Sequence, residues 1–375
     1  MPRKKSIVTV KLFRDLFRQY ACSDSVILRV SIWERLMDVK NIIRGLLFVT
    51  IALVVAPLIT MLISEGTAYF FQAEEEAVQA FSDSSVMQTY PLLDGIYVYD
   101  ATAGTVTAYS VEEYLTYSVL GTLQMDAESE LIKAQAVLMY TYILGRRLEE
   151  ENEPTEELYG CDMSSDTNKY VRLVDEESAR LIYGDEVDAY IEKVHNAVSE
   201  VAGEYITYNG NLIAPAYCIS NGGVSESAET VLGEDVAYLQ SVASEYDSDY
   251  VTELTYTSDE IFARITTQDE RITLLGEESE WIEITDTTDT GYVTYVTLDE
   301  EVIVTGRQLA SWLNLPSARF TVSYSGEFDR FTFTVYGNGH LVGLSQYGGN
   351  KMAAEGFSYA EIIEFYFTDI EIVMP

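Results

Sequence analysis

The sequence predicts an α+β fold, in which short strands and helices are interspersed without regular βαβ units. Three observations lead to this prediction: helical apolar periodicity recurs along the chain, short runs of alternating apolar residues lie between those stretches, and glycine-containing turns separate the runs. We expect a two-lobed domain over residues 90–375, because about 285 residues are enough for one large domain or two lobes.

The longest apolar run precedes that domain, at residues 45–64. It holds about 20 residues without a charge, which at 1.5 Å rise per residue is enough to cross the core of a bilayer. We predict one transmembrane helix, in which Pro57 introduces a kink that membrane helices tolerate. A cleaved signal peptide is the alternative, but its apolar stretch would lie close to the N-terminus rather than after 44 residues.

Charge predicts the orientation of this helix. Residues 1–44 carry ten Lys or Arg against four Asp or Glu, a net charge of +6, and such segments stay in the cytoplasm. Residues 65–375 then lie outside the cytoplasmic membrane, with 65–89 as a stalk. Residues 65–375 hold 13 of the chain's 23 basic residues and 57 of its 61 acidic residues, which gives them a net charge of −44. Because such a domain repels a polyanion, nucleic acid is the weakest partner hypothesis.

The domain is expected to begin with a hairpin and two helices. Residues 95–109 alternate around a glycine turn, and Ser110-Val-Glu-Glu113 offers a capping box at which a helix begins. A longer helix fits Ser129 to Arg147, followed by an acidic surface loop from Glu149 to Glu157. Its expected buried face consists of Leu131, Ala134, Leu138 and Tyr142.

The later elements continue the mixture. A helix fits Glu186 to Val201, and Asn209-Gly210 supplies a primed turn in the strongest hairpin signal of the chain. Residues 251–335 combine short strands with a helix from Gly306 to Leu313, and a last helix runs from Tyr359 to Phe367.

A glycine-rich segment near the C-terminus, residues 337–348, carries one of the two histidines of the chain. Glycines allow close backbone approach and positive φ, while His340, Ser345 and Gln346 supply hydrogen-bonding groups that a core would avoid. Such a loop suits a polar ligand, although a glycine-rich hairpin with an internally hydrogen-bonded histidine also explains it. The other histidine, His195, lies on a predicted helix and is interpreted as structural.

The cysteines give no sign of a metal or cofactor. Cys22 lies in the basic segment, so Cys161 and Cys218 are the only pair that could form a disulfide outside, and they could equally remain unpaired. We expect neither a bound metal nor another cofactor, because no closely spaced Cys/His cluster is present.

Four segments in order resemble the stage II sporulation protein D family, also called the LytB amidase-enhancer family. The family patterns are a helix of the type LKAQAVAARTY, an SGG or SNGG stretch, a YL-x-SV segment and a GHGVGMSQYGA loop. They correspond here to Leu131 to Tyr142, Ser220 to Gly223, Tyr238 to Val242 and Gly339 to Gly349. Order and spacing agree across residues 90–375, and the N-terminal anchor agrees with members at the outer face of the cytoplasmic membrane.

The resemblance implies a role on peptidoglycan glycan strands, because sporulation members look like lytic transglycosylases that act after a partner amidase has removed stem peptides. One carboxyl group then protonates the glycosidic oxygen and later takes the proton of the 6-hydroxyl. Alignment without gaps puts the family's catalytic Glu on Thr122, whose hydroxyl is far too weak an acid. The family's Arg becomes Tyr140, and the second cysteine of a zinc-site pattern becomes Thr167, so a metal is not expected here either.

The residues that the resemblance places on a glycan-binding cleft are retained. Each of them singly could be an ordinary surface or core residue, but as an ordered set they favour a cleft. They are Lys133, Gln135, Tyr217, Ser220, Asn221, His340, Ser345 and Gln346.

We therefore expect a membrane-anchored protein that binds glycan with little or no transglycosylase activity and acts as an enhancer or scaffold for a wall amidase during sporulation. A first alternative is an active enzyme in which Asp126 or Glu128 substitutes for the absent Glu. A second alternative is a structural partner of other sporulation membrane proteins, which uses its acidic surface and needs no glycan cleft.

Overall fold

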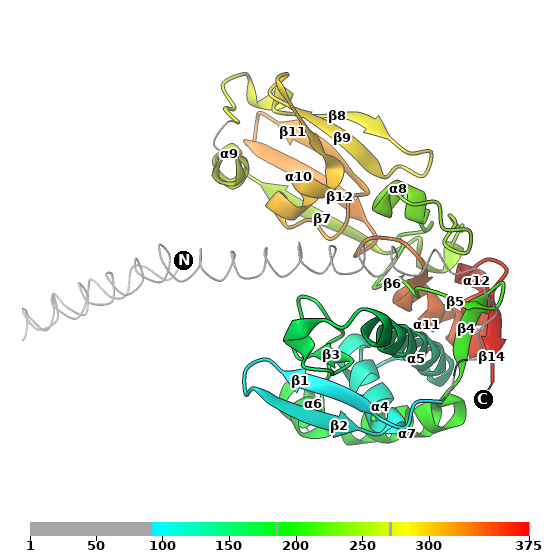
Figure 1. Ribbon diagram of the computed structural model, residues 1–375. Helices are drawn as coiled ribbons and strands as arrows, with labels where there is room; N and C mark the ends of the chain where they lie inside the picture. The colour runs from blue at the N-terminus through cyan, green and yellow to red at the C-terminus, as the bar shows by residue number, and fades with distance from the viewer. Residues whose placement is uncertain (1–89, 91, 185–186, 270–271, 375) are drawn as a thin grey trace, which may run out of the picture. The chain divides into compact units, whose positions relative to one another are not determined.

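The computed structural model describes residues 90, 92–184, 187–269 and 272–374 (Figure 1). Its α-helices are α4 (Val111–Thr122), α5 (Ser129–Asn152), α6 (Glu176–Tyr183), α7 (Val187–Val201), α8 (Ala228–Leu232), α9 (Ser258–Gln268), α10 (Gly306–Leu313), α11 (Gln346–Ala354) and α12 (Tyr359–Tyr366). Short 3-10 helices are η2 (Glu156–Leu158), η3 (Glu245–Asp247) and η4 (Glu278–Glu280). The basic segment, the expected transmembrane helix at 45–64 and the stalk lie outside the described residues. Within the described part, no helix is both long and apolar enough to cross a membrane.

The strands are short and spread along the chain. They are β1 (Ile96–Asp100), β2 (Thr105–Tyr109), β3 (Met163–Ser164), β4 (Tyr205–Tyr208), β5 (Asn211–Leu212), β6 (Tyr217–Cys218), β7 (Val251–Tyr256), β8 (Ile282–Thr287), β9 (Val293–Leu298), β10 (Val302–Thr305), β11 (Phe320–Ser325), β12 (Arg330–Tyr336), β13 (Leu344–Ser345) and β14 (Glu371–Val373). The predicted α+β class is confirmed, because small sheets and helices alternate without regular βαβ units.

Small sheets organise the described strands. Four sheets have three strands each, in the orders β2-β1-β3, β10-β9-β8, β11-β12-β7 and β14-β4-β5. The fifth pairs β6 with β13 in parallel, which aligns Leu344 with Tyr217 and Ser345 with Cys218. Because β6 directly precedes Ser220–Gly223 and β13 lies within Gly339–Gly349, this pair brings together two of the segments that carry the family resemblance.

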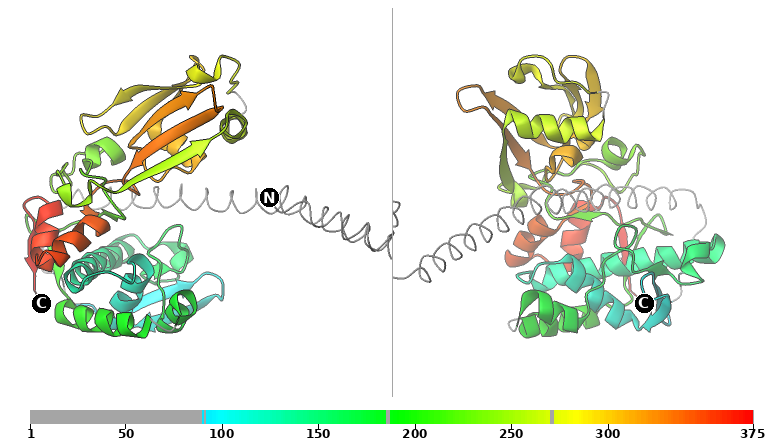
Figure 2. Two further views of the ribbon diagram at one scale, coloured as in Figure 1. Left: turned by 180° about the vertical axis from the view of Figure 1, so that it is seen from behind. Right: turned by 90° about the vertical axis from the view of Figure 1, so that its left-hand side faces the viewer.

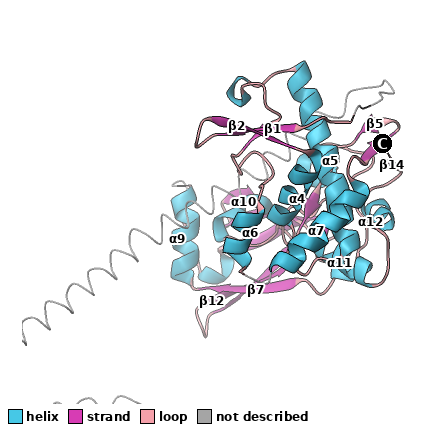
Figure 3. Cartoon of the chain, turned by 90° about the horizontal axis from the view of Figure 1, so that it is seen from below, coloured by secondary structure: helices cyan, strands magenta, loops and turns pink. Residues whose placement is uncertain are grey.

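Helix α5 lies at the centre of the helical part of the domain. Helices α4, α7, α11 and α12 all contact it, and Figure 3 shows them gathered around it. The prediction of one buried face is too narrow: Leu131, Ala134 and Leu138 are buried, but so are Ile132 and Val137 from other faces. It is wrong for Tyr142, which is only half-buried. A helix surrounded by neighbours buries most of its circumference.

The sheets β10-β9-β8 and β11-β12-β7 form the other main part of the domain, together with α9 and α10 (Figure 2). Aromatic side chains fill this part of the core. Trp281 stacks on Phe331 with a centroid distance of 6.1 Å, and Phe320 meets Phe333 edge to face at 5.8 Å. These sheets position the buried arginine described below, which precedes β11.

Local signals predicted several elements correctly. Ser110 and Glu113 form the expected capping box, and Asn209 and Gly210 have φ of 52° and 79°, as a primed turn requires. The prediction that an acidic loop begins at Glu149 is wrong for the first residues of that loop, because α5 continues to Asn152. Arg146 pairs with Glu149 and Glu150 across one helical turn and so supports this extension.

Candidate functional site

The Ser-Asn-Gly-Gly segment, residues 220–223, packs directly against the glycine-rich segment. Beyond the β6–β13 pair, Ser220 and Asn338 form an isolated antiparallel bridge. Gly343 has φ of +71°, and a Cβ there would lie 2.2 Å from the backbone oxygen of Ala216. The close approach that this glycine permits is therefore an approach between two segments of the same chain.

Asp247, the last residue of η3, is the buried centre of this contact. Its Oδ2 accepts hydrogen bonds from Ser220 Oγ at 3.0 Å, the Asn221 backbone amide at 2.7 Å and Ser345 Oγ at 2.6 Å. Its Oδ1 accepts the Gly223 amide at 3.2 Å. One carboxylate thus accepts hydrogen bonds from the Ser-Asn-Gly-Gly segment and from the glycine-rich segment. Hydrogen bonds to a charged acceptor are among the stronger ones in proteins, so Asp247 stabilises the contact between the two segments.

Sequence reasoning missed Asp247, which lies in none of the four motif segments. The signal that could have found it was indirect: Ser220 and Ser345 are polar residues in tight motif segments and need an acceptor when buried. Three of the expected glycan contacts, Ser220, Asn221 and Ser345, are fully buried at this carboxylate.

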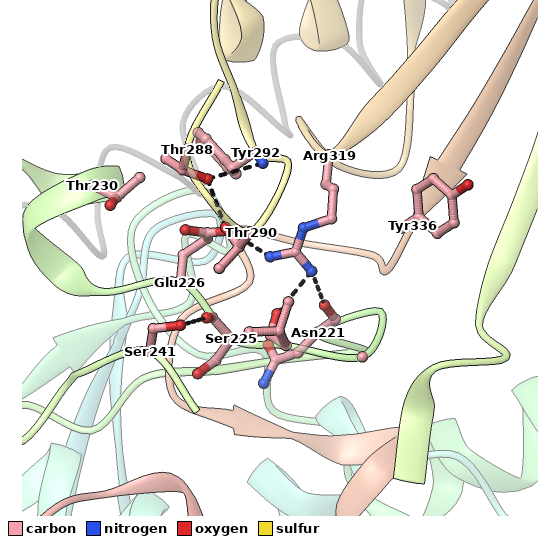
Figure 4. A network of polar contacts seen from close by, with 12 residues as sticks. Asn221, Ser225, Glu226, Thr230, Ser241, Thr288, Thr290, Tyr292, Arg319 and Tyr336 are labelled. Carbon is pink, nitrogen blue, oxygen red and sulfur yellow. Dashed lines mark hydrogen bonds and ion pairs between the residues drawn. The ribbon is translucent and has the colours of Figure 1, made fainter. Parts of the chain in front are cut away.

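Asn221 also connects the segment to a buried ion pair (Figure 4). Its Nδ2 donates to Gly343 O at 3.0 Å, and its backbone oxygen accepts from Arg319 Nη1 at 2.7 Å. Arg319 pairs with Glu226, which in turn accepts a hydrogen bond from Thr290 Oγ1. Because Glu226 N also donates to Leu341 O at 2.7 Å, this network joins the turn between β8 and β9 to the glycine-rich segment.

His340 uses both ring nitrogens inside the protein. The Val342 amide donates to Nδ1 at 3.0 Å, and Nε2 lies 2.8 Å from the backbone oxygen of Tyr217. Since Nδ1 is an acceptor, Nε2 carries the hydrogen and donates it, which defines the neutral tautomer. The geometry is that of the internally hydrogen-bonded histidine, one of the two interpretations that the sequence left open.

Lys133 and Gln135 occupy different environments on α5. Lys133 Nζ lies 2.8 Å from Glu130 Oε1 and 2.6 Å from Glu200 Oε2. Burial by itself would lower the pKa of Lys133, but its hydrogen bonds to these two carboxylates raise it above the usual value. Gln135 is fully buried, and its Oε1 lies 3.4 Å from Gln346 Nε2.

The Gln135 amide nitrogen is buried without a hydrogen-bond partner. An unsatisfied buried donor costs about 1–3 kcal/mol. A ligand group or a water molecule between α5 and α11 could accept this hydrogen bond and remove the cost. Gln135 and Gln346 can therefore still bind a polar group, whereas the hydroxyls of Ser220 and Ser345 already donate to Asp247.

Thr122 is the half-buried last residue of α4. Its Oγ1 donates to the Ser118 backbone oxygen at 2.8 Å, back into its own helix. The two substitute carboxylates of the first alternative, Asp126 and Glu128, are exposed in the connection to α5. This connection is held by Asn350 of α11, whose Oδ1 accepts the Glu128 amide at 2.7 Å.

Tyr140, on which the motif alignment puts the family's arginine, is fully buried, and its hydroxyl accepts the Leu93 amide at 3.1 Å. His195 lies on α7 with Nε2 2.9 Å from Glu176 Oε1. The hydrogen bond with His195 lowers the pKa of Glu176. Both contacts are internal to the fold.

The outer side of the motif segments carries half-buried aromatic groups, a half-buried lysine and one exposed apolar side chain. We call Ile219, Tyr250, Tyr347 and Lys351 the Tyr347 platform. Tyr347 N donates to Ile219 O at 2.9 Å, the Tyr347 ring meets Tyr250 edge to face at 5.0 Å, and Lys351 Nζ lies 4.6 Å from the ring centroid. Lys351 also binds Asp249 at 2.7 Å and lowers the pKa of that carboxyl. Ile219 is exposed, and Tyr217 beside it is half-buried.

Cysteines and other metal-ligating groups are scattered in the described residues, where no cluster of three or more His, Cys, Asp or Glu could hold a metal ion. Cys161 and Cys218 are buried and not joined by a disulfide. Burial raises the pKa of the Cys161 thiol, which keeps it protonated.

Comparisons with known proteins support the family resemblance. The family model SpoIID, stage II sporulation protein, matches residues 99–208. Stage II sporulation protein D of Bacillus subtilis (strain 168) is 27% identical over 316 residues, which are 80% of this chain and 89% of the relative. Its counterpart in Bacillus amyloliquefaciens is 27% identical over 73% of this chain and 77% of the relative. The amidase enhancer of Bacillus subtilis is 23% identical over 46% of this chain and 31% of the relative.

Proposed function

Because the chain belongs to the stage II sporulation protein D (SpoIID/LytB) family, we propose that it is a cell-wall protein of sporulation that binds peptidoglycan glycan strands without cleaving them by the family's acid mechanism. Residues 45–64 anchor it in the cytoplasmic membrane with its N-terminus inside, and its acidic domain acts outside as an enhancer or scaffold for a wall amidase.

One observation carries the proposal that the protein does not cleave glycan. The position of the family's acid is Thr122, whose hydroxyl donates to Ser118 O instead of offering a titratable proton. Loss of a general acid/base removes on the order of 10² to 10⁴ in rate. Asp126 and Glu128 lie beyond the end of α4, and a displacement of one helical turn, about 5.4 Å, already exceeds hydrogen-bonding reach.

The Tyr347 platform supports the glycan-binding part of the proposal. A sugar ring has apolar C–H faces and a polar rim, so it fits a surface that combines aromatic faces with hydroxyl, amide and ammonium groups. Tyr347 supplies an aromatic ring with a hydroxyl, Ile219 an exposed apolar side chain and Lys351 an ammonium group, all on the outer side of the packed motif segments. The buried serines and Asp247 then serve to hold the platform, rather than to contact sugar.

The amidase part of the proposal comes from the family. A relative that matches 46% of this chain is named an amidase enhancer. We therefore propose that this chain also acts beside an amidase, a role that requires no catalytic acid and so agrees with Thr122 at the acid position.

The experiment is a glycan digest with the purified full-length chain, its Thr122→Glu variant and Thr122→Gln as the matched variant without an acid. Glycan strands without stem peptides are incubated with each protein, and anhydro-muropeptides are measured by mass spectrometry. We expect release by Thr122→Glu only. A carboxyl at the last residue of α4 faces the negative end of the helix dipole, which favours the protonated form that an acid needs.

Release by the unmodified chain would contradict the proposal, and its loss in an Asp126→Asn/Glu128→Gln variant would then support the active-enzyme alternative. Glycan binding is tested separately by co-sedimentation. We expect Tyr347→Ala to weaken it about tenfold, with exposed Phe328→Ala as the control. A chain that does not co-sediment with glycan at all supports the structural-partner alternative.

A further inference from the structure

A pocket of about 660 Å³ lies between β9, α8 and α10. Its volume is within the range of small-ligand sites. None of its lining residues belongs to the four segments that resemble the family, so it is separate from the motif segments and the Tyr347 platform.

The walls of the pocket combine ring faces with hydroxyl and amide groups. Tyr295 of β9 is 49% exposed, and Trp312 of α10 is half-buried, so both offer ring surface to a ligand. Ser311 and the amide nitrogen of Gln308 add polar groups beside them. Thr294 Oγ1 donates to Asp286, and Gln308 Oε1 accepts the Thr305 amide at the start of α10, so these two atoms are held in place at the wall. Aromatic faces with a few polar groups match a pyranose ring, whose faces are apolar and whose edges carry hydroxyls.

The charge of the pocket differs from that of the chain. Arg307 is the only basic residue and Asp286 the only acidic residue of the lining, whereas the whole chain has a net charge of −38. Arg307 Nη1 donates to Val231 O at 3.0 Å, which fixes the guanidinium at the wall. Guanidinium groups recognise carboxylates through charge-assisted hydrogen bonds, so the ligand is expected to carry one.

Backbone and side-chain contacts hold the pocket in shape without a ligand. At the first residue of α10, Gly306, a Cβ would lie 2.0 Å from Val293 O, so the helix packs directly on β9. The Tyr292 amide donates to Thr288 Oγ1 at 3.1 Å, and Thr288 Oγ1 lies 2.6 Å from Thr290 Oγ1, which bonds to Glu226 (Figure 4). A preformed site loses less freedom when a ligand binds.

The pocket suits a sugar better than a peptide strand. β9 is the central strand of β10-β9-β8, so its backbone groups pair with both neighbours. A peptide that adds to a sheet needs a free edge strand, whereas this pocket presents side chains from the face of a central strand and from a helix.

We propose that this pocket binds a carboxylate-bearing amino sugar of the N-acetylmuramic acid type, as a second glycan contact of the protein. The choice of this sugar rests on the proposed function, while the presence of a saccharide site rests on the pocket itself. Tyr295 and Trp312 contact the sugar ring, and Arg307 pairs with its carboxylate.

The test titrates the purified full-length chain with the disaccharide of N-acetylglucosamine and N-acetylmuramic acid, and separately with chitobiose, which lacks the carboxylate. Binding is followed by tryptophan fluorescence and by ligand-observed NMR. We expect Tyr295→Ala to raise the Kd for both sugars about tenfold. Arg307→Met should raise the Kd for the muramyl disaccharide about tenfold and leave the Kd for chitobiose nearly unchanged. Phe328→Ala and Arg330→Met, two exposed residues outside the pocket, are the matched controls.

Absence of disaccharide binding to the unmodified chain overturns the proposal, as does equal binding by the unmodified chain and Tyr295→Ala. Equal losses of both sugars in Arg307→Met overturn the pairing with a carboxylate, and binding of free stem peptide in place of the sugars overturns the ligand class. Circular dichroism melts of each variant separate loss of fold from loss of binding. Because Tyr347→Ala reports on the Tyr347 platform and Tyr295→Ala reports on the pocket, the pocket can fail its test while the proposed function stands.

Discussion

Replacement of Asp247 by alanine tests whether this buried carboxylate holds the two motif segments together. The carboxylate is fully buried and accepts four hydrogen bonds, from Ser220 Oγ, Asn221 N, Ser345 Oγ and Gly223 N. Alanine removes all four and leaves the donors in a buried site. Each unsatisfied donor costs about 1–3 kcal/mol, but relief of the desolvated charge and rotation of the hydroxyls offset part of this loss. We expect the free energy of unfolding to fall by about 4 kcal/mol.

Asp247→Asn separates the shape of the side chain from its acceptors. If the amide nitrogen occupies the Oδ1 position, only the 3.2 Å bond from Gly223 N is lost and the three bonds to the other oxygen remain. We expect a loss of about 1–2 kcal/mol for this variant.

Urea unfolding of the full-length variants, followed by circular dichroism, measures both losses. Asp249→Ala is the matched control, because Asp249 lies two residues further on with an exposed side chain paired to Lys351, and exposed ion pairs contribute little. If the Asp247→Ala and Asp249→Ala variants unfold at the same urea concentration, Asp247 does not stabilise the contact between the two motif segments.

Two further predictions concern backbone approach and pH. Gly343→Ala should destabilise the protein by about 3 kcal/mol or more in the same assay, because its Cβ meets Ala216 O. Gly160→Ala, with φ of +81° and nothing within 4 Å of the added Cβ, should show only the smaller conformational strain; equal losses would contradict the packing argument. Burial raises the pKa of Glu204, which accepts the Tyr359 hydroxyl at 2.9 Å, so stability from this group is present at acid pH and is lost as pH rises through its folded-state pKa. Glu204→Gln should therefore be more stable than the unmodified chain at neutral pH. The difference between their melting temperatures should shrink as pH falls toward the ordinary carboxyl pKa of 4.5. A difference that does not change with pH would show that Glu204 does not titrate in this way.

Helix ends and tight turns were predictable where the signal lies within a few residues. The capping box at Ser110, the turn at Asn209-Gly210 and the helix Gly306–Leu313 all follow from side-chain-to-backbone bonds or φ preferences of neighbouring residues. Such contacts need no information from the rest of the chain.

Helix α11 was not predicted, because Gly348 and Gly349 disfavour a helix by about 1 kcal/mol each relative to alanine. The fold compensates for this cost in two ways. Ser345 caps the helix by accepting the Gly348 amide at 3.0 Å, and an added Cβ at Gly349 would meet Leu131 of α5 at 3.1 Å. The expected glycine-rich loop therefore ends at Ser345, earlier than its sequence suggests.

The sequence by itself determined the α+β class, the four motif segments in order and the alignment that puts the family's acid on Thr122. Only the tertiary structure decided what the motif residues do. Ser220, Asn221 and Ser345 turn toward Asp247, and both nitrogens of His340 bond to the backbone. The physical reason is that a buried polar group must find a partner wherever the fold brings one, and the partners here lie up to 123 residues away, beyond any local pattern.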